Sequence, residues 1–266
     1  MDGDPELPVV LTIAGSDSGG GAGIQADLKV FAALGVFGTS AVTAVTAQNP
    51  RRASKIFSVP SDLVGAQIRA VFDAFDVRAI KCGMLGTAAN VRAVRDALRA
   101  RRQSPSARFQ VPRLVVDPIL RATSGATLLE PKARAVLERE LLPLATLVTP
   151  NLGEARAFLG RAMPMRDAAE ALAQRWGCAV YLKGGHGIDP RRATDVFCDG
   201  RTAVELTETR VPGRKIHGLG CATSAAIAAF SAQGHSLLDS MVMAKAFMTQ
   251  AIRLARRAGN HWVLRM

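Results

Sequence analysis

Short apolar runs alternate with longer amphipathic segments along most of the chain. The apolar runs have the length of strands, and they lie at residues 8–14, 38–46, 77–82, 113–117, 145–149 and 178–184. Segments with helical periodicity lie between them, at residues 22–34, 60–74, 87–101, 130–141, 151–159 and 165–176. This alternation is typical of βαβ units, and it predicts a mostly parallel sheet.

The predicted strands are continuous apolar runs rather than alternating ones, as in Arg113–Asp117. Strands of this kind are covered on both faces, so we expect helices on both sides of the sheet. The pattern then predicts a short hairpin, residues 194–199 and 202–209, and two closing helices, residues 219–233 and 236–257. The sequence therefore predicts one α/β domain over residues 1–266.

The chain carries a net charge of +12, from 34 Lys and Arg against 22 Asp and Glu. Basic pairs such as Arg51-Arg52 and Arg191-Arg192 are scattered and have no aromatic residues among them. We therefore expect solvated helix faces and no nucleic-acid partner. The positive field would instead help to recruit an anionic small molecule.

The four cysteines form no C-x-x-C pair, which argues against a zinc site or a redox dithiol. No apolar run has the length of a membrane span, and the acidic first six residues are unlike a secretory signal. We therefore expect a cytoplasmic protein without a membrane partner.

A glycine-rich segment joins the first predicted strand to the first predicted helix. Its glycines stand at positions 15, 19, 20, 21 and 23, and they fit neither the G-x-x-x-x-G-K-[ST] phosphate loop nor the G-x-G-x-x-G dinucleotide fingerprint. A helix that begins near Ala22 would direct free N–H groups into this loop. We expect a small polar ligand there, and the alternative is a flexible turn.

A second glycine-rich segment, His217-Gly-Leu-Gly-Cys221, opens an alanine-rich helix. Gly218 and Gly220 permit a nest of backbone N–H groups, which would hold an anion such as a transferred phosphoryl group. The helix dipole should lower the pKa of the Cys221 thiol in the first turn. Alternatively, Cys221 is a small buried residue that packs the helix on the sheet. We expect structural roles for His186 and His217.

Polar residues follow several other predicted strands. Lys183 precedes two glycines, where it suits a nucleotide phosphate, and Gln48 could either read a donor/acceptor edge or cap a turn. Asn151 and Glu154 have the spacing of a helix capping box. Glu154 and Asp117 could also hold Mg²⁺.

The segment Ala14–Lys29 resembles the opening motif of the hydroxymethylpyrimidine/phosphomethylpyrimidine kinases, thiamine-pathway enzymes of the ribokinase superfamily. Six further segments match in family order and extend over nearly the whole chain, namely Thr43–Asn49, Lys81–Leu85, Val115–Pro118, Thr149–Ala155, Leu182–His186 and His217–Cys221. The resemblance implies a ribokinase-like three-layer sandwich and a homodimer. It implies an enzyme that uses ATP and Mg²⁺ to phosphorylate 4-amino-5-hydroxymethyl-2-methylpyrimidine and then its monophosphate.

The resemblance also implies roles for individual residues. Cys221 would take the proton of the substrate hydroxyl, beside an anion hole of Gly218, Leu219 and Gly220. The substrate would contact Gly15, Asp27, Gln48, Met84 and Ile119, with Gln48 at the pyrimidine and Asp27 near the hydroxymethyl group. Asn151, Lys183 and Lys245 would bind ATP, and Asp117 and Glu154 would organise Mg²⁺. Core packing is the alternative for Met84, and a solvated helix face is the alternative for Lys245.

The chain departs from the family pattern close to the second glycine-rich segment. Leu219 stands where the family usually has threonine, and Val211–Ile216 lacks the usual Thr/Asn pattern. These changes bear on nucleotide binding rather than on the fold. They leave open a catalytically inactive pyrimidine sensor, and the shared loop and cysteine leave open a pyridoxal kinase. Gln48 favours the aminopyrimidine, and Cys221 favours an enzyme.

Overall fold

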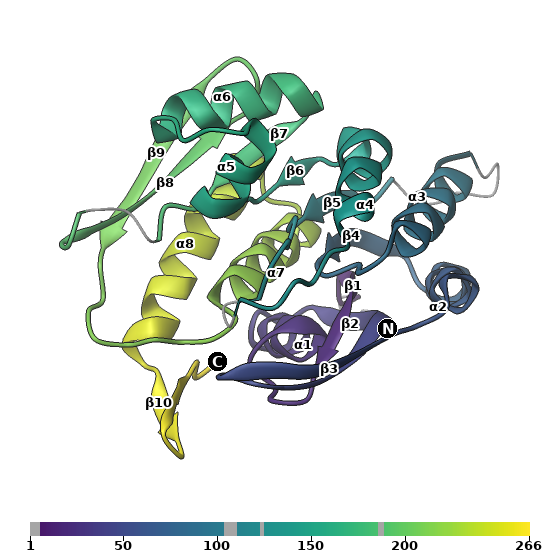
Figure 1. The fold of residues 1–266 in the computed structure, drawn as a ribbon, viewed down its shortest axis with the longest axis horizontal. Helices are drawn as coiled ribbons and strands as arrows, with labels where there is room; N and C mark the ends of the chain where they lie inside the picture. Colours follow the sequence, from purple (N-terminus) through teal and green to yellow (C-terminus); the bar gives the residue numbers. More distant parts are fainter. Residues whose placement is uncertain (1–5, 104–110, 123–124, 186–188) are drawn as a thin grey trace, which may run out of the picture.

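The computed structural model describes residues 6–103, 111–122, 125–185 and 189–266. In this part of the chain one large sheet has the strand order β3-β2-β1-β4-β5-β6-β7-β8-β9 (Figure 1). Its strands are β1 (Val9–Asp17), β2 (Phe37–Asn49), β3 (Arg52–Ser58), β4 (Val77–Cys82), β5 (Arg113–Val116), β6 (Leu147–Val148), β7 (Ala179–Leu182), β8 (Arg192–Cys198) and β9 (Ala203–Thr209). The middle strands, from β2 to β7 in this order, are parallel, and the edge strands β3, β8 and β9 pair antiparallel.

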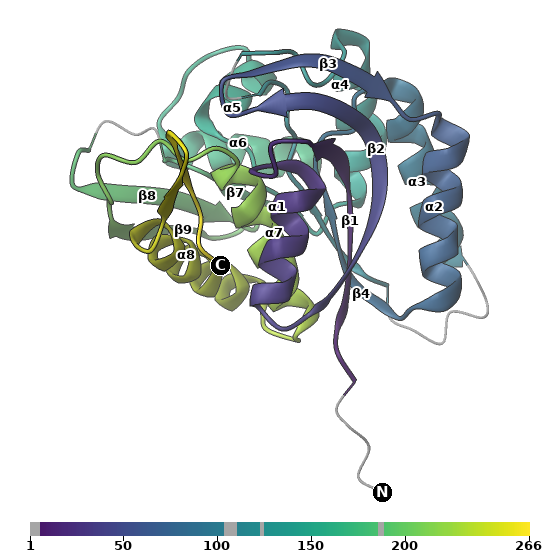
Figure 2. The same cartoon turned by 90° about the horizontal axis from the view of Figure 1, so that it is seen from below.

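Helices cover both faces of this sheet and make three layers (Figure 2). One face packs against α1 (Gly23–Ala33), α7 (Leu219–Ala232) and α8 (Leu237–Arg253). The other face packs against α2 (Ser61–Ala74), α3 (Ala88–Gln103), α4 (Pro131–Val136), α5 (Leu152–Leu159) and α6 (Met165–Trp176). The predicted α/β sandwich with a mostly parallel sheet is therefore confirmed.

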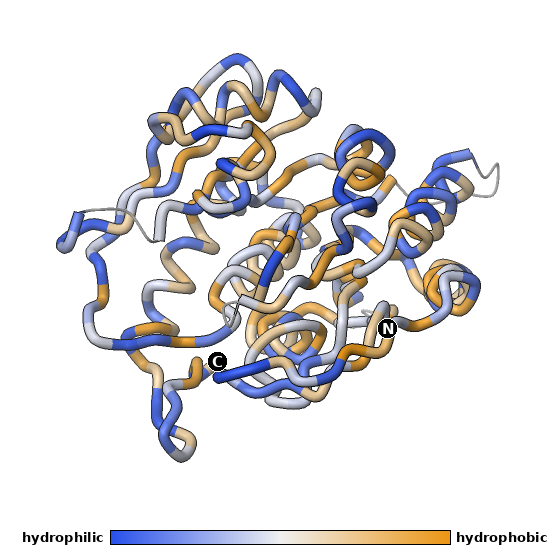
Figure 3. Tube along the Cα trace, in the orientation of Figure 1, coloured by the Kyte–Doolittle hydropathy of each residue, from blue (hydrophilic) through white to orange (hydrophobic). Residues whose placement is uncertain are grey.

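Strand β1 shows why its run of apolar residues is continuous. Successive side chains point to opposite faces, so Leu11 and Ile13 join the cluster under α2 to α6, whereas Val10 joins the cluster under α1, α7 and α8. All three side chains are fully buried, and each contributes about 1.5–3 kcal/mol of hydrophobic stabilisation. Figure 3 shows the same division at large, with apolar segments inside and polar ones over the outer helices.

Strand β3 is one element of the large sheet that the apolar pattern did not predict. Its residues, Arg52–Ser58, are mostly exposed and include charged side chains, so they carry no buried-strand signal. The strand forms because β2 continues to Asn49, beyond the predicted end at residue 46, and offers its free edge. The two strands extend past the sheet and lie beside the carboxyl end of β1 (Figure 2).

Three predicted boundaries were wrong. The last helix ends at Arg253 instead of residue 257, and a small hairpin of β10 (Arg256–Ala258) and β11 (His261–Val263) follows it. The predicted strand 145–149 keeps only the two residues of β6. The predicted helix 130–141 divides into α4, a π-helical turn at Leu137–Leu141 and a 3-10 turn at Leu142–Leu144. Within the described ranges no helix combines the length and apolarity needed to cross a membrane.

Candidate active site

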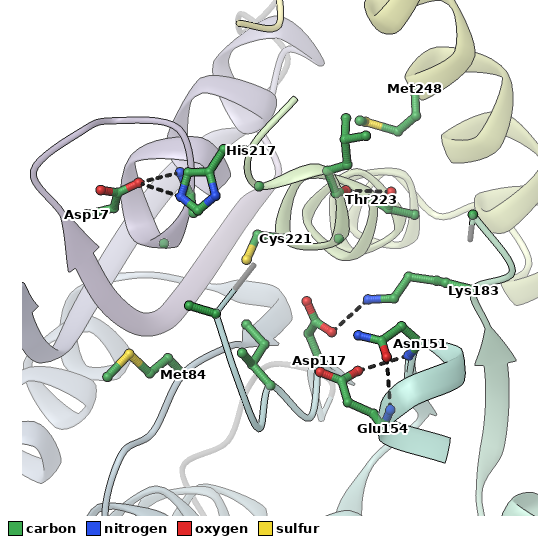
Figure 4. A pocket seen from close by; sticks show the side chains of 18 of the residues that line it. Asp17, Met84, Asp117, Asn151, Glu154, Lys183, His217, Cys221, Thr223 and Met248 are labelled. Atoms are coloured by element: carbon green, nitrogen blue, oxygen red, sulfur yellow. Dashed lines mark hydrogen bonds and ion pairs between the residues drawn. The ribbon is translucent and has the colours of Figure 1, made fainter. Parts of the chain in front are cut away.

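A cavity of about 450 Å³ opens at the carboxyl ends of the parallel strands (Figure 4). The residues after β1, β4, β5, β6 and β7 line it, and so does the first turn of α7. Open α/β sheets bind their ligands at this edge, where the loops from several strands meet.

The cavity collects nearly all of the residues that the sequence singled out. Those that line it are Gly15, Gln48, Met84, Asp117, Ile119, Asn151, Glu154, Lys183, Gly218, Leu219, Gly220, Cys221 and Lys245. His186 lies outside the described residues. Elements far apart in the sequence therefore bring their polar residues to one place.

Asp27 is the exception, and its predicted contact with the substrate needs correction. Its side chain is fully buried on α1, behind the wall of the cavity, and it is not among the lining residues. Both of its oxygens bind Lys81 Nζ, at 2.9 and 2.8 Å, and Oδ2 also accepts from Thr12 Oγ1 at 2.6 Å. These partners already occupy the carboxylate, and Lys81, which Asp27 holds in place, does line the cavity.

The two glycine-rich segments pack directly on one another. Gly218 has φ of +83° just before α7, and a Cβ on it would overlap the carbonyl oxygen of Gly21. Only glycine satisfies both the left-handed backbone and this close approach. The first turn of α7 therefore lines the cavity with backbone N–H groups that the helix itself leaves free, as an anion hole requires.

Cys221 lies in this first turn, but its thiol is not acidic as the helix dipole predicted. Burial raises the pKa of Cys221 to about 11. The charge of Lys81 opposes this shift, whereas the carboxylates of Asp117 and Asp27 add to it. The prediction of a lowered pKa was wrong because desolvation of a thiolate outweighs a helix terminus at this position.

Asp117, Glu154 and Lys183 form a charged cluster beside the start of α7 (Figure 4). Asp117 Oδ2 accepts a hydrogen bond from Ser224 Oγ of that helix at 3.3 Å. Lys183 Nζ lies 2.8 Å from Asp117 Oδ1. Burial, together with the nearby charge of Asp117, raises the pKa of Glu154 to about 7. Burial alone would lower the pKa of Lys183. The charges of Asp117 and Glu154 outweigh burial and raise this pKa above the ordinary value of a lysine. The cluster thus concentrates negative charge that a bound cation would relieve.

The capping box predicted for Asn151 and Glu154 is confirmed. Asn151 Oδ1 accepts from the Glu154 backbone N–H and Glu154 Oε2 accepts from the Asn151 backbone N–H, both at 2.9 Å. This pairing holds both side chains at the start of α5, where they also line the cavity. The capping role and a ligand role are therefore compatible.

The cluster also fits a magnesium ion in its chemistry. Mg²⁺ prefers one or two carboxylates and keeps several waters alongside substrate phosphates. Asp117 and Glu154 supply the two carboxylates. Burial is the larger cause of the raised pKa of Glu154, and repulsion from the charge of Asp117 adds to it. Within the described residues, no group of three or more His, Cys, Asp or Glu side chains forms a closed metal site.

Lys245 is not the solvated helix residue that local sequence allowed. It is 8% exposed, and its Nζ lies 2.6 Å from Asp195 Oδ2, which also accepts from Tyr181 Oη at 2.6 Å. This network anchors α8 to the strands β7 and β8 and aims a buried cation at the cavity.

Sequence reasoning missed His217 and Asp17 as parts of the site. His217 Nε2 lies 3.2 Å from Asp17 Oδ2 and 3.0 Å from Gln48 Nε2, and all three residues line the cavity. Asp17 Oδ1 also accepts from the backbone N–H of Gly19, and Oδ2 accepts from that of Ala22. Asp17 lies within Ala14–Lys29 and His217 begins His217–Cys221, so their places in these two motifs were the sequence signal that could have identified them.

Three arginines, which the sequence did not single out, also line the cavity. They are Arg121, Arg210 and Arg214. Their guanidinium groups suit phosphate, and they add positive charge near the predicted anion hole.

Known proteins resemble this chain over most of its length. The family model described as phosphomethylpyrimidine kinase matches residues 17–264. A hydroxymethylpyrimidine/phosphomethylpyrimidine kinase from Rhizobium meliloti (strain 1021) is 48% identical, over 94% of this chain and 92% of that protein. A thiamine biosynthesis bifunctional protein from Geobacter sulfurreducens is 42% identical over 94% of this chain, which spans 50% of that protein.

Solved structures show the same fold. An ADP complex of Bacillus subtilis pyridoxal kinase aligns with a TM-score of 0.86 and 32% identity, covering 98% of this chain and 97% of that one. A phosphomethylpyrimidine kinase from Clostridium difficile 630 aligns with a TM-score of 0.78 and 34% identity, covering 93% and 100%. The sandwich described above is therefore that of the ribokinase-like vitamin kinases.

Proposed function

We propose that the cavity is the active site of this chain, which belongs to the phosphomethylpyrimidine kinase family. The chain is an ATP-dependent kinase of thiamine biosynthesis that phosphorylates 4-amino-5-hydroxymethyl-2-methylpyrimidine and then its monophosphate. The observation that carries the site is that the first turn of α7, with its free N–H groups, and the Lys183 cluster lie side by side at one cavity.

The reaction moves the γ-phosphoryl group of ATP to the hydroxyl group of the acceptor. The substrate hydroxyl oxygen forms a bond to the γ-phosphorus of ATP, and the bond from that phosphorus to the ADP oxygen breaks. The backbone of Gly218, Leu219 and Gly220 stabilises the charge on the transferred group. Cys221 accepts the hydroxyl proton as its thiolate. Because burial raises the pKa of this thiol to about 11, the thiolate is the minor form at neutral pH, and the charge of Lys81 favours it.

The acceptor lies between Gly15, Gln48, Met84 and Ile119. A Gln amide both donates and accepts, which matches the ring nitrogen and exocyclic amine of the aminopyrimidine. Met84 is 7% exposed and packs with Ala44 and Leu128, so it forms an apolar floor while it also lines the cavity.

ATP lies toward Asn151, Lys183 and Lys245. Carboxylates hold the ammonium groups of both lysines, at 2.8 Å for Lys183 and 2.6 Å for Lys245, and so position them for phosphate. Leu219 keeps the backbone N–H of the family's threonine but offers no hydroxyl, and α7 begins at this residue in regular geometry. The departure at position 219 therefore leaves the anion hole itself in place.

Mg²⁺ would be held by Asp117 and Glu154 together with the phosphates of the nucleotide. When bound, it would neutralise charge on those phosphates. Lys183 shares Asp117 with this site, so the ammonium and the metal would act on the same part of the nucleotide.

We further propose that residues 1–266 act as one kinase domain and that the protein is a cytoplasmic homodimer. One sheet extends through the described chain, which supports a single domain. All four cysteines are unpaired, as suits a reducing compartment. The exposed apolar face of the β2–β3 extension supports a dimer contact.

The deciding experiment measures ATP turnover with hydroxymethylpyrimidine, with pyridoxal or with no acceptor, and resolves the mono- and diphosphate products. We expect both pyrimidine products. Cys221→Ala should lower kcat by about 10²–10⁴-fold and leave the pyrimidine affinity near that of the wild type. Turnover of pyridoxal alone would reject the role of Gln48, and undiminished turnover by Cys221→Ala would reject the proton acceptor.

A further inference from the structure

Asp17, His217 and Gln48 form a chain of contacts from the first glycine-rich loop to the substrate pocket. His217 Nε2 is the central atom, at 3.2 Å from Asp17 Oδ2 and 3.0 Å from Gln48 Nε2. The other end of the Gln48 amide lies 3.3 Å from Thr46 Oγ1. A single imidazole nitrogen is either a donor or an acceptor. His217 Nε2 therefore cannot donate to the Asp17 carboxylate and also accept from the Gln48 amide nitrogen, so either the tautomer of His217 or the orientation of the Gln48 amide must be reassigned.

The contacts of Asp17 show which atom carries the proton between Asp17 and His217. Its carboxylate accepts from His217 and from the backbone N–H groups of Gly19 and Ala22, and although burial opposes ionisation, these bonds lower its pKa. An ionised carboxylate has no proton to give, so the proton between Asp17 and His217 belongs to His217 Nε2. With the opposite tautomer, the Nε2 lone pair would face a carboxylate oxygen.

The second ring nitrogen of His217 supports the same tautomer. Nδ1 is buried and has no hydrogen-bond partner among the described residues. A proton there would be a buried donor without an acceptor, which costs about 1–3 kcal/mol. The contacts of both ring nitrogens therefore favour a proton on Nε2.

Thr46 decides the orientation of Gln48 from the other side. Its hydroxyl donates its only proton to the Ser16 carbonyl oxygen at 2.9 Å, which is shorter than its contact with Gln48. Thr46 Oγ1 can then only accept from Gln48, so the amide nitrogen belongs there. The amide oxygen consequently faces His217 Nε2. The oxygen and nitrogen of a Gln amide have nearly the same shape, so this exchange needs no movement.

We propose that Asp17 and His217 are a positioning pair that holds the Gln48 amide with its oxygen toward His217 and its nitrogen toward Thr46. One N–H of Gln48 and one lone pair of its oxygen then remain for the ligand. The inference rests on the proposed role of Gln48 in binding the acceptor. It predicts that the ring nitrogen of the aminopyrimidine lies on the Thr46 side and its amine on the His217 side.

The first test reads the tautomer directly in the ligand-free protein. Long-range ¹⁵N–¹H spectra of histidine-labelled protein at neutral pH distinguish the two ring nitrogens, and His217→Leu assigns the signals among the four histidines. We expect a proton on Nε2. An unprotonated Nε2, with the proton on Nδ1, would overturn the proposal without touching the proposed enzyme activity.

The second test is a double-mutant cycle on the KM for hydroxymethylpyrimidine at saturating ATP. Losing one well-placed hydrogen bond should raise KM about 10-fold in His217→Leu and in Gln48→Leu, with kcat within about 2-fold of the wild type. The double variant should match Gln48→Leu alone, because His217 acts through Gln48. His217→Gln retains N–H donors for both neighbours and should recover most of the affinity.

Two results of the cycle would contradict the positioning role. Effects of His217→Leu and Gln48→Leu that add in the double variant would mean that His217 only supports the packing of the loops. A fall in kcat with an unchanged KM would mean that His217 acts on the anion hole next to it. Absence of pyrimidine turnover in the wild type would reject the proposed function, while the tautomer measurement would still test the contact chain.

Discussion

At the scale of single residues, burial rather than residue type decides the chemistry of this site. Glu154 shows this in a form that pH can test. Burial and the charge of Asp117 raise its pKa from 4.5 to about 7. The carboxyl of Glu154 therefore binds its proton more tightly in the folded protein than in the unfolded chain. The contribution of this proton to the free energy of unfolding is fully present below pH 4.5 and is lost as pH rises through about 7.

We expect Glu154→Gln to match the wild type in stability at pH 4.5 and to exceed it by up to about 3 kcal/mol at pH 8. Gln can still accept the capping hydrogen bond, so the comparison isolates the charge. Denaturant unfolding across this pH range measures the difference. Glu170→Gln, at an exposed position of α6, is the control and should follow the wild type. A constant difference between Glu154→Gln and the wild type would contradict the raised pKa.

Sequence reasoning reached the residues at the strand ends but not their surroundings. Asp117 and Lys183 could be predicted because parallel strands bring their carboxyl ends to one edge. The burial of Asp27 behind Lys81 could not be predicted, because it depends on where α1 packs. The raised pKa of Cys221 could not be predicted either, since burial and the charges of Asp117 and Asp27 outweigh both the helix terminus that the sequence shows and the opposing charge of Lys81.

At the scale of elements, the site depends on how closely two loops approach one another. Gly218 allows the start of α7 to touch the Gly21 carbonyl, and this contact sets where the proposed anion hole lies relative to the first glycine-rich loop. The elements at the edges of the molecule form for a different reason. β3 and β10 are exposed and carry charged residues, so their formation depends on a partner strand rather than on an apolar pattern.

Gly218→Ala should therefore lose activity as well as stability. Gly35 offers a matched control, because it has a similar φ of +69° but no atom within 4 Å of an added Cβ. Gly35→Ala should cost about 1–2 kcal/mol of stability and keep the wild-type kcat. Gly218→Ala should cost more and should lower kcat at least about 10-fold, since the Gly21 carbonyl must move. Equal kcat values for the two variants would show that the close approach is not needed.

At the scale of the whole molecule, the β2–β3 extension stands out as an apolar surface on a highly charged protein. Val45 and Phe57 pair across the two strands and are 53% and 69% exposed. Thr46 and Gln48, on the opposite side of β2, face the cavity. A partner on the exposed side would thus stabilise the strand that carries Gln48, which links the proposed dimer to substrate binding.

Light scattering coupled to gel filtration tests this surface. We expect the wild type to be a dimer and Phe57→Asp to be a monomer, because a charge cannot be buried in an apolar contact without a partner. Val242→Asp on α8 replaces an apolar residue of 46% exposure away from this surface and should remain dimeric. The monomer should also show a raised KM for hydroxymethylpyrimidine, since the edge strand then loses its support. A wild type that is monomeric would reject the dimer, and a dimeric Phe57→Asp would reject this face as its interface.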